Sequence, residues 1–191
     1  MCVFCGSNPG LDPAYAAEAE ATGRALAERG IGLVYGGGSV GLMGLVAAAC
    51  MEAGGDVTGI IPEFLDAAEV AKRDITRLEV TATMHDRKAR MAELSDGFLA
   101  LPGGIGTFEE AFETMTWTQL GVHDKPIALV DVNGFYAPAA ALLDRAVADG
   151  FLAVDVRASI VVAPTGSEAL DAFATWERPA LGKWTEKDVQ L

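Results

Sequence analysis

Basic side chains are scarce in this sequence. Its 191 residues contain 14 Lys and Arg against 27 Asp and Glu, which gives a formal net charge of −13. Such an acidic chain repels nucleic acids and anionic membranes, so neither is expected as a partner. A phosphorylated small molecule can bind only where local groups overcome this field. The densest basic cluster, Arg87, Lys88 and Arg90, therefore becomes a candidate region.

Long hydrophobic runs are also missing. No apolar run approaches the roughly 20 residues that a membrane-spanning helix needs, although 51% of the residues are hydrophobic. Residues 1–6 are too short and lack the basic residues of a secretory signal. We therefore expect a cytoplasmic protein with one sizeable core.

Cysteine and histidine are few, at three and two residues. Cys2 and Cys5 lie three positions apart in an apolar run, so in a strand they point to opposite faces and are expected to be structural. Cys50 lies in a helix candidate and is expected to be packed. His85 and His123 have neither metal-like spacing nor acidic neighbours that form a ligand set. No metal site is predicted.

Short apolar runs alternate with longer helical segments along the whole chain. Strands are expected at residues 2–5, 31–35, 57–61, 79–81, 97–101, 126–130 and 160–162. Helices are expected at 13–29, 42–53, 84–94, 107–120, 136–149 and 167–176. This alternation predicts an α/β fold: a Rossmann-like, doubly wound parallel sheet with helices on both faces, in a single domain. Residues 1–176 are assigned to this domain, and the polar residues 177–191 to a C-terminal extension.

Two glycine-rich loops stand where a strand feeds a helix, YGGGSVGLMG at 35–44 and PGGIGTFEE at 102–110. This geometry points free backbone N–H groups and the positive end of a helix dipole at a ligand, and phosphate is the natural occupant. Neither loop has the lysine of a P-loop, and the first lacks the acidic residue expected about 20 positions on in a dinucleotide site. Without a ligand, both loops would simply be tight turns.

Parallel strands bring their carboxyl ends to one edge of the sheet, where a third loop, Gly6-Ser7-Asn8, also lies. The predicted substrate- and phosphate-binding residues in these loops are Ser7, Gly37, Gly38, Ser39, Gly103, Gly104, Gly106 and Thr107.

The helix expected at 84–94 carries a mixed apolar and basic stripe. Met84, Arg87, Lys88 and Met91 share a face by their spacing, and this face could grip a base and a sugar phosphate. Met84 and Lys88 are accordingly predicted to bind substrate.

Three carboxylates, Glu109, Glu110 and Glu113, lie in the first turns of the helix after Pro102. Because Glu109 and Glu110 point about 100° apart, only one of them readily faces the site. Glu113 is expected on the same side as Glu110. Acidic residues here also complement the helix dipole, which is a sufficient structural reason for any one of them.

Several segments together resemble the LOG (Lonely Guy) family of cytokinin riboside 5′-monophosphate phosphoribohydrolases, often called lysine decarboxylase-like. They are FCGS at 4–7, YGGGSVGLMG at 35–44, MHDRK at 84–88, PGGIGTFEE at 102–110 and WTQLGVHDKP at 117–126. The resemblance implies hydrolysis of the N-glycosidic bond of N6-substituted adenosine 5′-monophosphates and of AMP. It implies that Arg87 and Glu110 are the catalytic pair, that no cofactor is needed and that the protein is a homodimer. Asp86 stands where the family often has Glu, a mild change.

Two other functions remain open from the sequence. A non-enzymatic carrier of a nucleotide or of the molybdenum cofactor would share the fold and the glycine loops, but it has no need for a carboxylate at the sugar. A pyridoxal-phosphate decarboxylase requires a Schiff-base lysine. The five lysines, Lys72, Lys88, Lys125, Lys183 and Lys187, offer no recognisable context for one.

Overall fold

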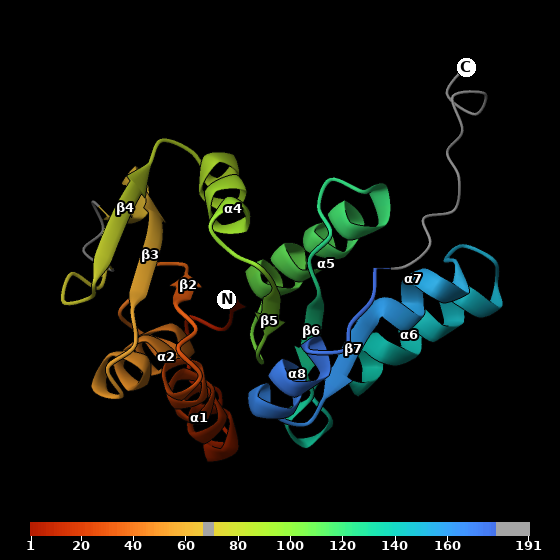
Figure 1. Ribbon diagram of the computed structural model, residues 1–191, viewed down its shortest axis with the longest axis horizontal. Coiled ribbons are helices and arrows are strands. Elements are labelled where there is room, and N and C mark those ends of the chain that lie inside the picture. The colour runs from red at the N-terminus through yellow and green to blue at the C-terminus, as the bar shows by residue number, and fades with distance from the viewer. Residues whose placement is uncertain (67–70, 179–191) are drawn as a thin grey trace.

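Seven short strands form one parallel sheet in the computed structural model, which describes residues 1–66 and 71–178 (Figure 1). The strands are β1 (Cys2–Phe4), β2 (Leu33–Tyr35), β3 (Val57–Pro62), β4 (Arg77–Thr81), β5 (Phe98–Ala100), β6 (Ile127–Val130) and β7 (Ile160–Ala163). Their order is β4-β3-β2-β1-β5-β6-β7, and every neighbouring pair is parallel. The predicted fold class is therefore confirmed.

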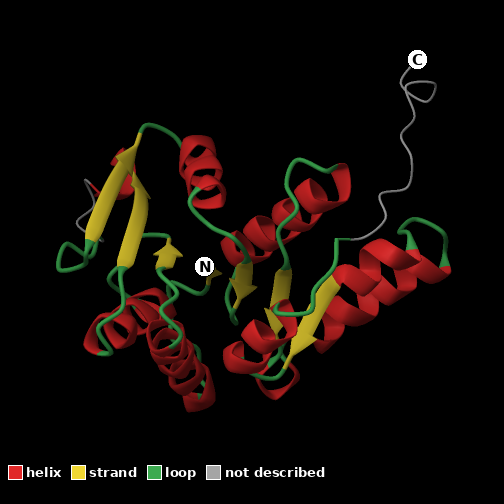
Figure 2. Cartoon of the chain, viewed as in Figure 1, coloured by secondary structure: helices red, strands yellow, loops and turns green. Residues whose placement is uncertain are grey.

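The helices alternate with these strands (Figure 2). They are α1 (Pro13–Glu28), α2 (Gly41–Glu52), α3 (Glu63–Asp66), α4 (Met84–Glu93), α5 (Ile105–Leu120), the 3-10 turn η1 (Val132–Gly134), α6 (Ala137–Ala148), α7 (Val154–Ser159) and α8 (Gly166–Phe173). Local signals set their ends. Asp12 caps α1 by accepting from the Ala14 N–H, Pro13 occupies its first turn, and Gly30 follows its end with a φ of +67°.

Two buried clusters lie on opposite faces of the sheet. One joins strand residues to α1, α2 and α8 through Leu26, Val46 and Leu170. The other joins the sheet to α4 and α5 through Met91 and Met115. Because both faces are covered, the inner strands are almost entirely apolar, whereas the edge strand β4 carries Arg77, Glu79 and Thr81.

The sheet reverses its winding direction between β1 and β5. From β1 the chain adds β2, β3 and β4 on one side, then crosses back to place β5 beside β1 before adding β6 and β7. The segment after β1 leads to α1 on one face, whereas the segment after β5 leads to α5 on the other. Loops that diverge in this way leave a crevice at the carboxyl edge of the sheet, where ligands of such folds bind.

The structure differs from the predicted elements mainly in short or terminal segments. α5 begins at Ile105 rather than at residue 107, β4 begins at Arg77 rather than 79, and α8 ends at Phe173 rather than 176. α3, η1 and α7 were not predicted, because three to six residues are too few to show helical periodicity. The domain boundary at 176 stays a prediction, since residues 179–191 lie outside the described part of the chain.

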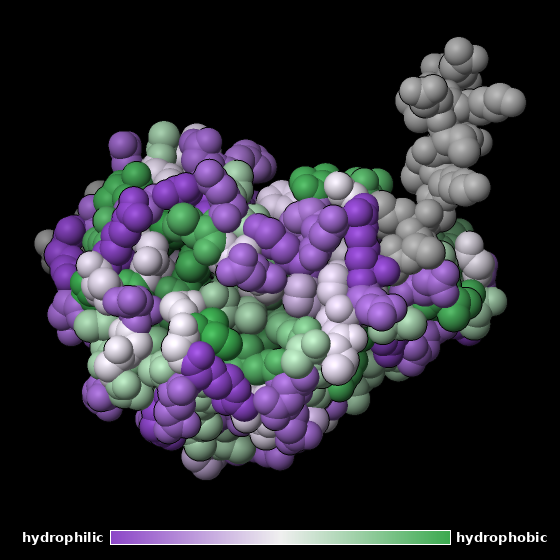
Figure 3. All heavy atoms as spheres, in the orientation of Figure 1, coloured by the Kyte–Doolittle hydropathy of each residue, from purple (hydrophilic) through white to green (hydrophobic). Residues whose placement is uncertain are grey.

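Polar side chains cover much of the face in Figure 3, and apolar atoms show in the hollow between them. Among the residues that the structure describes, no helix combines the length and apolarity needed to cross a bilayer.

Candidate active site

α4 begins at a defined cap that fixes which of its side chains faces the sheet. The Thr83 hydroxyl oxygen accepts from the Asp86 N–H at 3.1 Å and the hydroxyl donates to the Asp86 carboxylate at 2.7 Å. From this start, Arg87 falls on the buried side of the helix and is only 8% exposed. Its Nε donates to the carbonyl of Ile60 in β3 at 3.1 Å. The guanidinium is therefore held at the carboxyl end of the sheet.

Gly104 is the N-cap residue of α5; it is extended and provides no side-chain cap. The N–H groups of the first helical turn therefore have no intrahelical acceptor, and the positive end of the dipole of a 16-residue helix coincides with them. An added Cβ at Gly104 or Gly106 would meet no atom within 4 Å, so there is open space beside both residues. This helix end has the chemistry of an anion site.

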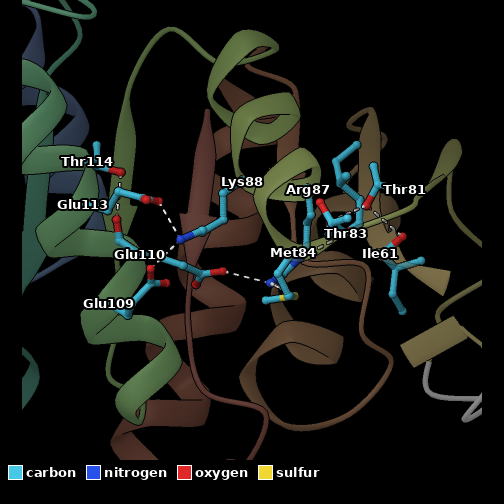
Figure 4. A network of polar contacts seen from close by, with 11 residues as sticks. Ile61, Thr81, Thr83, Met84, Arg87, Lys88, Glu109, Glu110, Glu113 and Thr114 are labelled. Atoms are coloured by element: carbon cyan, nitrogen blue, oxygen red, sulfur yellow. Dashed lines mark hydrogen bonds and ion pairs between the residues drawn. The ribbon is translucent and has the colours of Figure 1, made fainter. Parts of the chain in front are cut away.

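Arg87 and Glu110 point toward one another from α4 and α5 (Figure 4). Nη1 of Arg87 lies 3.0 Å from Oε1 of Glu110, and both side chains are 9% exposed. The sequence prediction that these two residues act together is thus consistent with their geometry. Burial raises the pKa of the Glu110 carboxyl above its ordinary value, whereas the Arg87 charge lowers it.

Glycines allow the segments around this pair to approach closely. A Cβ at Gly36 would lie 2.1 Å from Nη2 of Arg87, so only glycine leaves room for the guanidinium. A Cβ at Gly103 would lie 2.2 Å from the Thr107 hydroxyl and 2.9 Å from the Gly6 nitrogen. The Gly6 N–H in turn donates to the Pro102 carbonyl at 3.0 Å, which joins the loops after β1 and β5.

A cavity of about 340 Å³ opens between these loops. We call it the Arg87–Glu110 cavity. Its lining residues come from β1 and its loop, the loop after β2, α2, α3, α4 and the first turns of α5: Val3, Phe4, Cys5, Gly6, Ser7, Gly36, Met43, Leu65, Arg87, Met91, Gly104, Ile105, Gly106, Thr107 and Glu110. A second hollow of about 290 Å³ shares Gly6, Ser7 and Gly104 with it, and the rings of Tyr15 and Phe135 contribute to its lining.

The structure brings together part of the predicted binding set. Ser7, Gly104, Gly106 and Thr107 line the Arg87–Glu110 cavity, and Gly103 lines the neighbouring hollow.

The other predicted binding residues lie outside the lining of this cavity. Gly37 is buried with a φ of +74°, and its carbonyl accepts from the Lys72 N–H, while Gly38 forms a bridge to Ala71. Ser39 is exposed beyond them. The Met84 sulfur lies 3.8 Å from Nη1 of Arg87. Substrate binding by these four residues stays a prediction.

Lys88 also lies outside the lining of this cavity. It turns away from Arg87 toward α5, where it contacts Glu109 and lies 2.9 Å from Oε2 of Glu113 (Figure 4). Glu113 borders the same small space as Glu110, as expected, and it shares the Lys88 ammonium with Glu109.

Nine lining residues of the cavity were not in the predicted site set: Val3, Phe4, Cys5, Gly6, Gly36, Met43, Leu65, Met91 and Ile105. Gly36 and Met43 belong to the glycine-rich loop at 35–44, and Met91 belongs to the apolar and basic stripe of the helix expected at 84–94. Their place in these segments was the available signal. Leu65 belongs to the short α3, which gave no signal.

His85 and His123 lie apart from the cavity. His85 is exposed, and the His123 ring stacks on Phe98 with centroids 5.2 Å apart. Burial lowers the pKa of His123. The three cysteines are buried free thiols, in agreement with the structural role expected for them.

Comparisons with known proteins give the family. A family model described as possible lysine decarboxylase matches residues 43–173. The cytokinin riboside 5′-monophosphate phosphoribohydrolase LOG of Oryza sativa subsp. japonica is 49% identical over 168 residues, which cover 88% of this chain and 69% of the relative. LOG3 of Arabidopsis thaliana, with the same activity in its name, is 48% identical over 168 residues, covering 88% and 78%.

A solved structure, the molybdenum cofactor carrier protein of Chlamydomonas reinhardtii, superposes with a TM-score of 0.69 at 21% identity and covers 92% of this chain and 94% of that one. At that identity the likeness concerns the fold alone. The relatives at nearly half identity over most of both chains show more: this chain belongs to the LOG family of cytokinin riboside 5′-monophosphate phosphoribohydrolases.

Proposed function

We propose that this protein hydrolyses the N-glycosidic bond of N6-substituted adenosine 5′-monophosphates, and of AMP, to release the free base and ribose 5-phosphate. The observation that carries the proposal is the buried Arg87–Glu110 pair in the wall of a cavity that the start of α5 also lines. An anion site and a carboxylate a few residues apart suit a substrate with a phosphate at one end and a developing cation at the other.

The 5′-phosphate would bind at the first turn of α5. The amides of Gly104 and Gly106 and the hydroxyl of Thr107 are the donors proposed for it, with Ser7 from the facing loop. Because the chain carries a net charge of −13, this local positive potential must exceed a repulsive global field. The binding energy of the phosphate is then available to orient the distant reacting bond.

The C1′–N9 bond breaks with its electron pair passing to the base, which leaves positive charge on C1′ and the ring oxygen. The Glu110 carboxylate would stabilise that cation from the cavity wall. A water then forms a bond to C1′ and gives up a proton, while the departing base gains one at a ring nitrogen. Arg87 would hold Glu110 in place and support the ribose or the leaving base.

The two alternatives fit the site less well. A carrier would not need the buried Glu110. A Schiff-base lysine must lose its proton, yet carboxylate contacts to Lys88 outweigh burial and raise its pKa. Lys72 pairs with Asp74, and the Lys125 ammonium donates to the Ala92 carbonyl. Lys183 and Lys187 lie outside the described residues.

The test is a base-release assay. AMP and isopentenyladenosine monophosphate are incubated with the purified protein, with the two free ribosides as controls, and released base is separated and quantified. Release from the monophosphates alone supports the proposal. Equal release from the ribosides would overturn the phosphate assignment, and no release from any substrate would overturn the activity.

We propose further that the active form is a cytoplasmic homodimer. Its ligand is a nucleoside monophosphate, and it binds neither nucleic acid nor membranes. Three exposed apolar side chains on α5, Ile105, Phe112 and Leu120, are spaced seven and eight residues apart and so share one face of the helix. Such a stripe suits a contact between two copies of the chain.

A further inference from the structure

Lys88 is a buried cation that the proposed chemistry does not use. It is 9% exposed, and its ammonium contacts Glu109 and lies 2.9 Å from Oε2 of Glu113. These two carboxylates are 50% and 28% exposed. They flank Glu110 on α5, one residue before it and three residues after it.

Two parallel links therefore join α4 to α5. Arg87 pairs with Glu110, and the next residue, Lys88, pairs with Glu109 and Glu113 (Figure 4). The space that Lys88 and Glu110 share, over Phe4, Phe98 and Trp117, measures only about 10 Å³. No part of a nucleotide fits there, so the ammonium acts on the protein and not on the substrate.

We propose that Lys88 is a positioning residue of the active site: it fixes α5 against α4 and neutralises the two carboxylates beside Glu110, which keeps Glu110 ionised and facing Arg87. The proposal rests on the hydrolase function proposed above, in which Glu110 acts as a carboxylate.

The charges around Glu110 come from three elements. Arg87 and Lys88 face it from α4, and Glu109 and Glu113 lie beside it on α5. The thiols of Cys2 in β1 and of Cys5 just after it complete the set; burial raises their pKa values, so they stay neutral.

These groups act on Glu110 in opposite directions. Burial raises the pKa of Glu110, Arg87 lowers it, Glu109 and Glu113 raise it, and Lys88 lowers it. Removing Lys88 alone therefore raises the pKa, so a higher pH is needed to ionise the carboxyl. Removing Lys88 together with Glu109 and Glu113 removes contributions to the Glu110 pKa that act in opposite directions, so they cancel.

The experiment measures kcat for AMP hydrolysis across pH in four variants. Lys88→Met removes the charge and keeps the length of the side chain, Lys88→Arg keeps the charge, and the triple variant Lys88→Met/Glu109→Gln/Glu113→Gln removes all three charges. Arg90→Met is the matched control. Arg90 also lies on α4 and pairs with two carboxylates, those of Glu79 and Glu93, but it faces away from α5.

We expect the acidic limb of the profile to move to higher pH by roughly one unit in Lys88→Met, which is about tenfold lower kcat on that limb. Lys88→Arg and the triple variant should bring the limb back toward that of the unaltered protein, and Arg90→Met should leave it in place. A uniform loss of kcat at all pH values in Lys88→Met, not relieved in the triple variant, would overturn the proposal in favour of a purely structural role.

A second measurement separates this proposal from the hydrolase function. The ¹³C carboxyl resonance of Glu110, identified by its disappearance in Glu110→Gln, can be titrated without substrate. A titration midpoint higher in Lys88→Met and restored in the triple variant supports the role of Lys88 even if AMP is not hydrolysed. An unchanged midpoint overturns it even if AMP is hydrolysed.

Discussion

At the residue scale, the site depends on one carboxyl group inside the protein. Glu110 is 8% exposed, and burial opposes its ionised form and raises its pKa. The Arg87 charge, at 3.0 Å, acts in the opposite direction. Such a pair contributes little net stability compared with apolar packing, so its presence at the carboxyl edge of the sheet points to a role in the reaction.

Replacing Glu110 with Gln tests that role. We expect base release from AMP to fall on the order of a hundredfold or more, because the amide cannot stabilise a developing cation. The amide oxygen can still accept from Arg87, so circular dichroism should show a folded protein and calorimetry should show AMP still bound. Unchanged release by the folded variant would remove Glu110 from the mechanism.

Gly36→Ala tests the placement of Arg87. The new methyl group would lie 2.1 Å from Nη2 of Arg87, so the guanidinium must move away from Glu110. We expect kcat/KM for AMP to fall by roughly tenfold to a hundredfold, since a displacement of about 1 Å at a catalytic group has effects of that size. Gly32→Ala is the control, because its nearest neighbour would be 3.8 Å away. Equal activity of the two variants would contradict the close contact.

The sequence predicted the identity of these residues better than their contacts. Arg87 and Glu110 follow from motif positions, and the structure places them together. Lys88 could not be placed, because spacing says which residues share a helix face but not which neighbouring helix lies opposite. Gly37 and Gly38 belonged to a true strand-to-helix loop, yet only Gly36 borders the cavity, since the sharp turn at Gly37 leads the chain away.

At the element scale, caps and glycine turns decide where the functional helices begin. The sheet and its order follow from the alternation of apolar runs with helical segments. The start of α5 was predicted two residues late because Gly104 caps it without a side chain and so leaves no sequence signal. The same missing cap leaves the amides of the first turn available for an anion.

Thr83→Ala tests the cap of α4. Loss of the Thr83 hydroxyl frees the Asp86 N–H, and we expect the free energy of unfolding to fall by about 1 kcal/mol. Because this cap starts the helix that carries Arg87, kcat for AMP should fall as well. Thr165→Ala removes an equivalent cap, on α8, where Thr165 accepts from the Glu168 N–H. Thr165→Ala should lower the free energy of urea unfolding by a similar amount and leave kcat unchanged. Equal kcat values in the two variants would count against coupling between the α4 cap and the Arg87–Glu110 cavity.

At the scale of the whole molecule, the stripe of Ile105, Phe112 and Leu120 connects the cavity to a proposed interface. Ile105 lines the Arg87–Glu110 cavity and is 82% exposed, whereas Leu120, 56% exposed, lies at the far end of the same helix. A second copy seated along α5 would therefore approach the mouth of the cavity. The spacing of apolar residues within one chain does not by itself distinguish such a face from an exposed one.

Leu120→Glu tests this interface, because a charge buried between two copies without a partner opposes association. We expect light scattering after size exclusion to give the mass of a dimer for the unaltered protein and of a monomer, 19.9 kDa per chain, for the variant. Leu142→Glu on α6 is the matched control: Leu142 is 62% exposed but lies on another helix, so this variant should remain a dimer. If Leu120→Glu stays dimeric while Leu142→Glu dissociates, the two copies meet through α6. We also compare kcat for AMP and the circular dichroism spectrum of Leu120→Glu with those of the unaltered protein. If kcat falls on dissociation while the spectrum is unchanged, the second copy completes the mouth of the cavity.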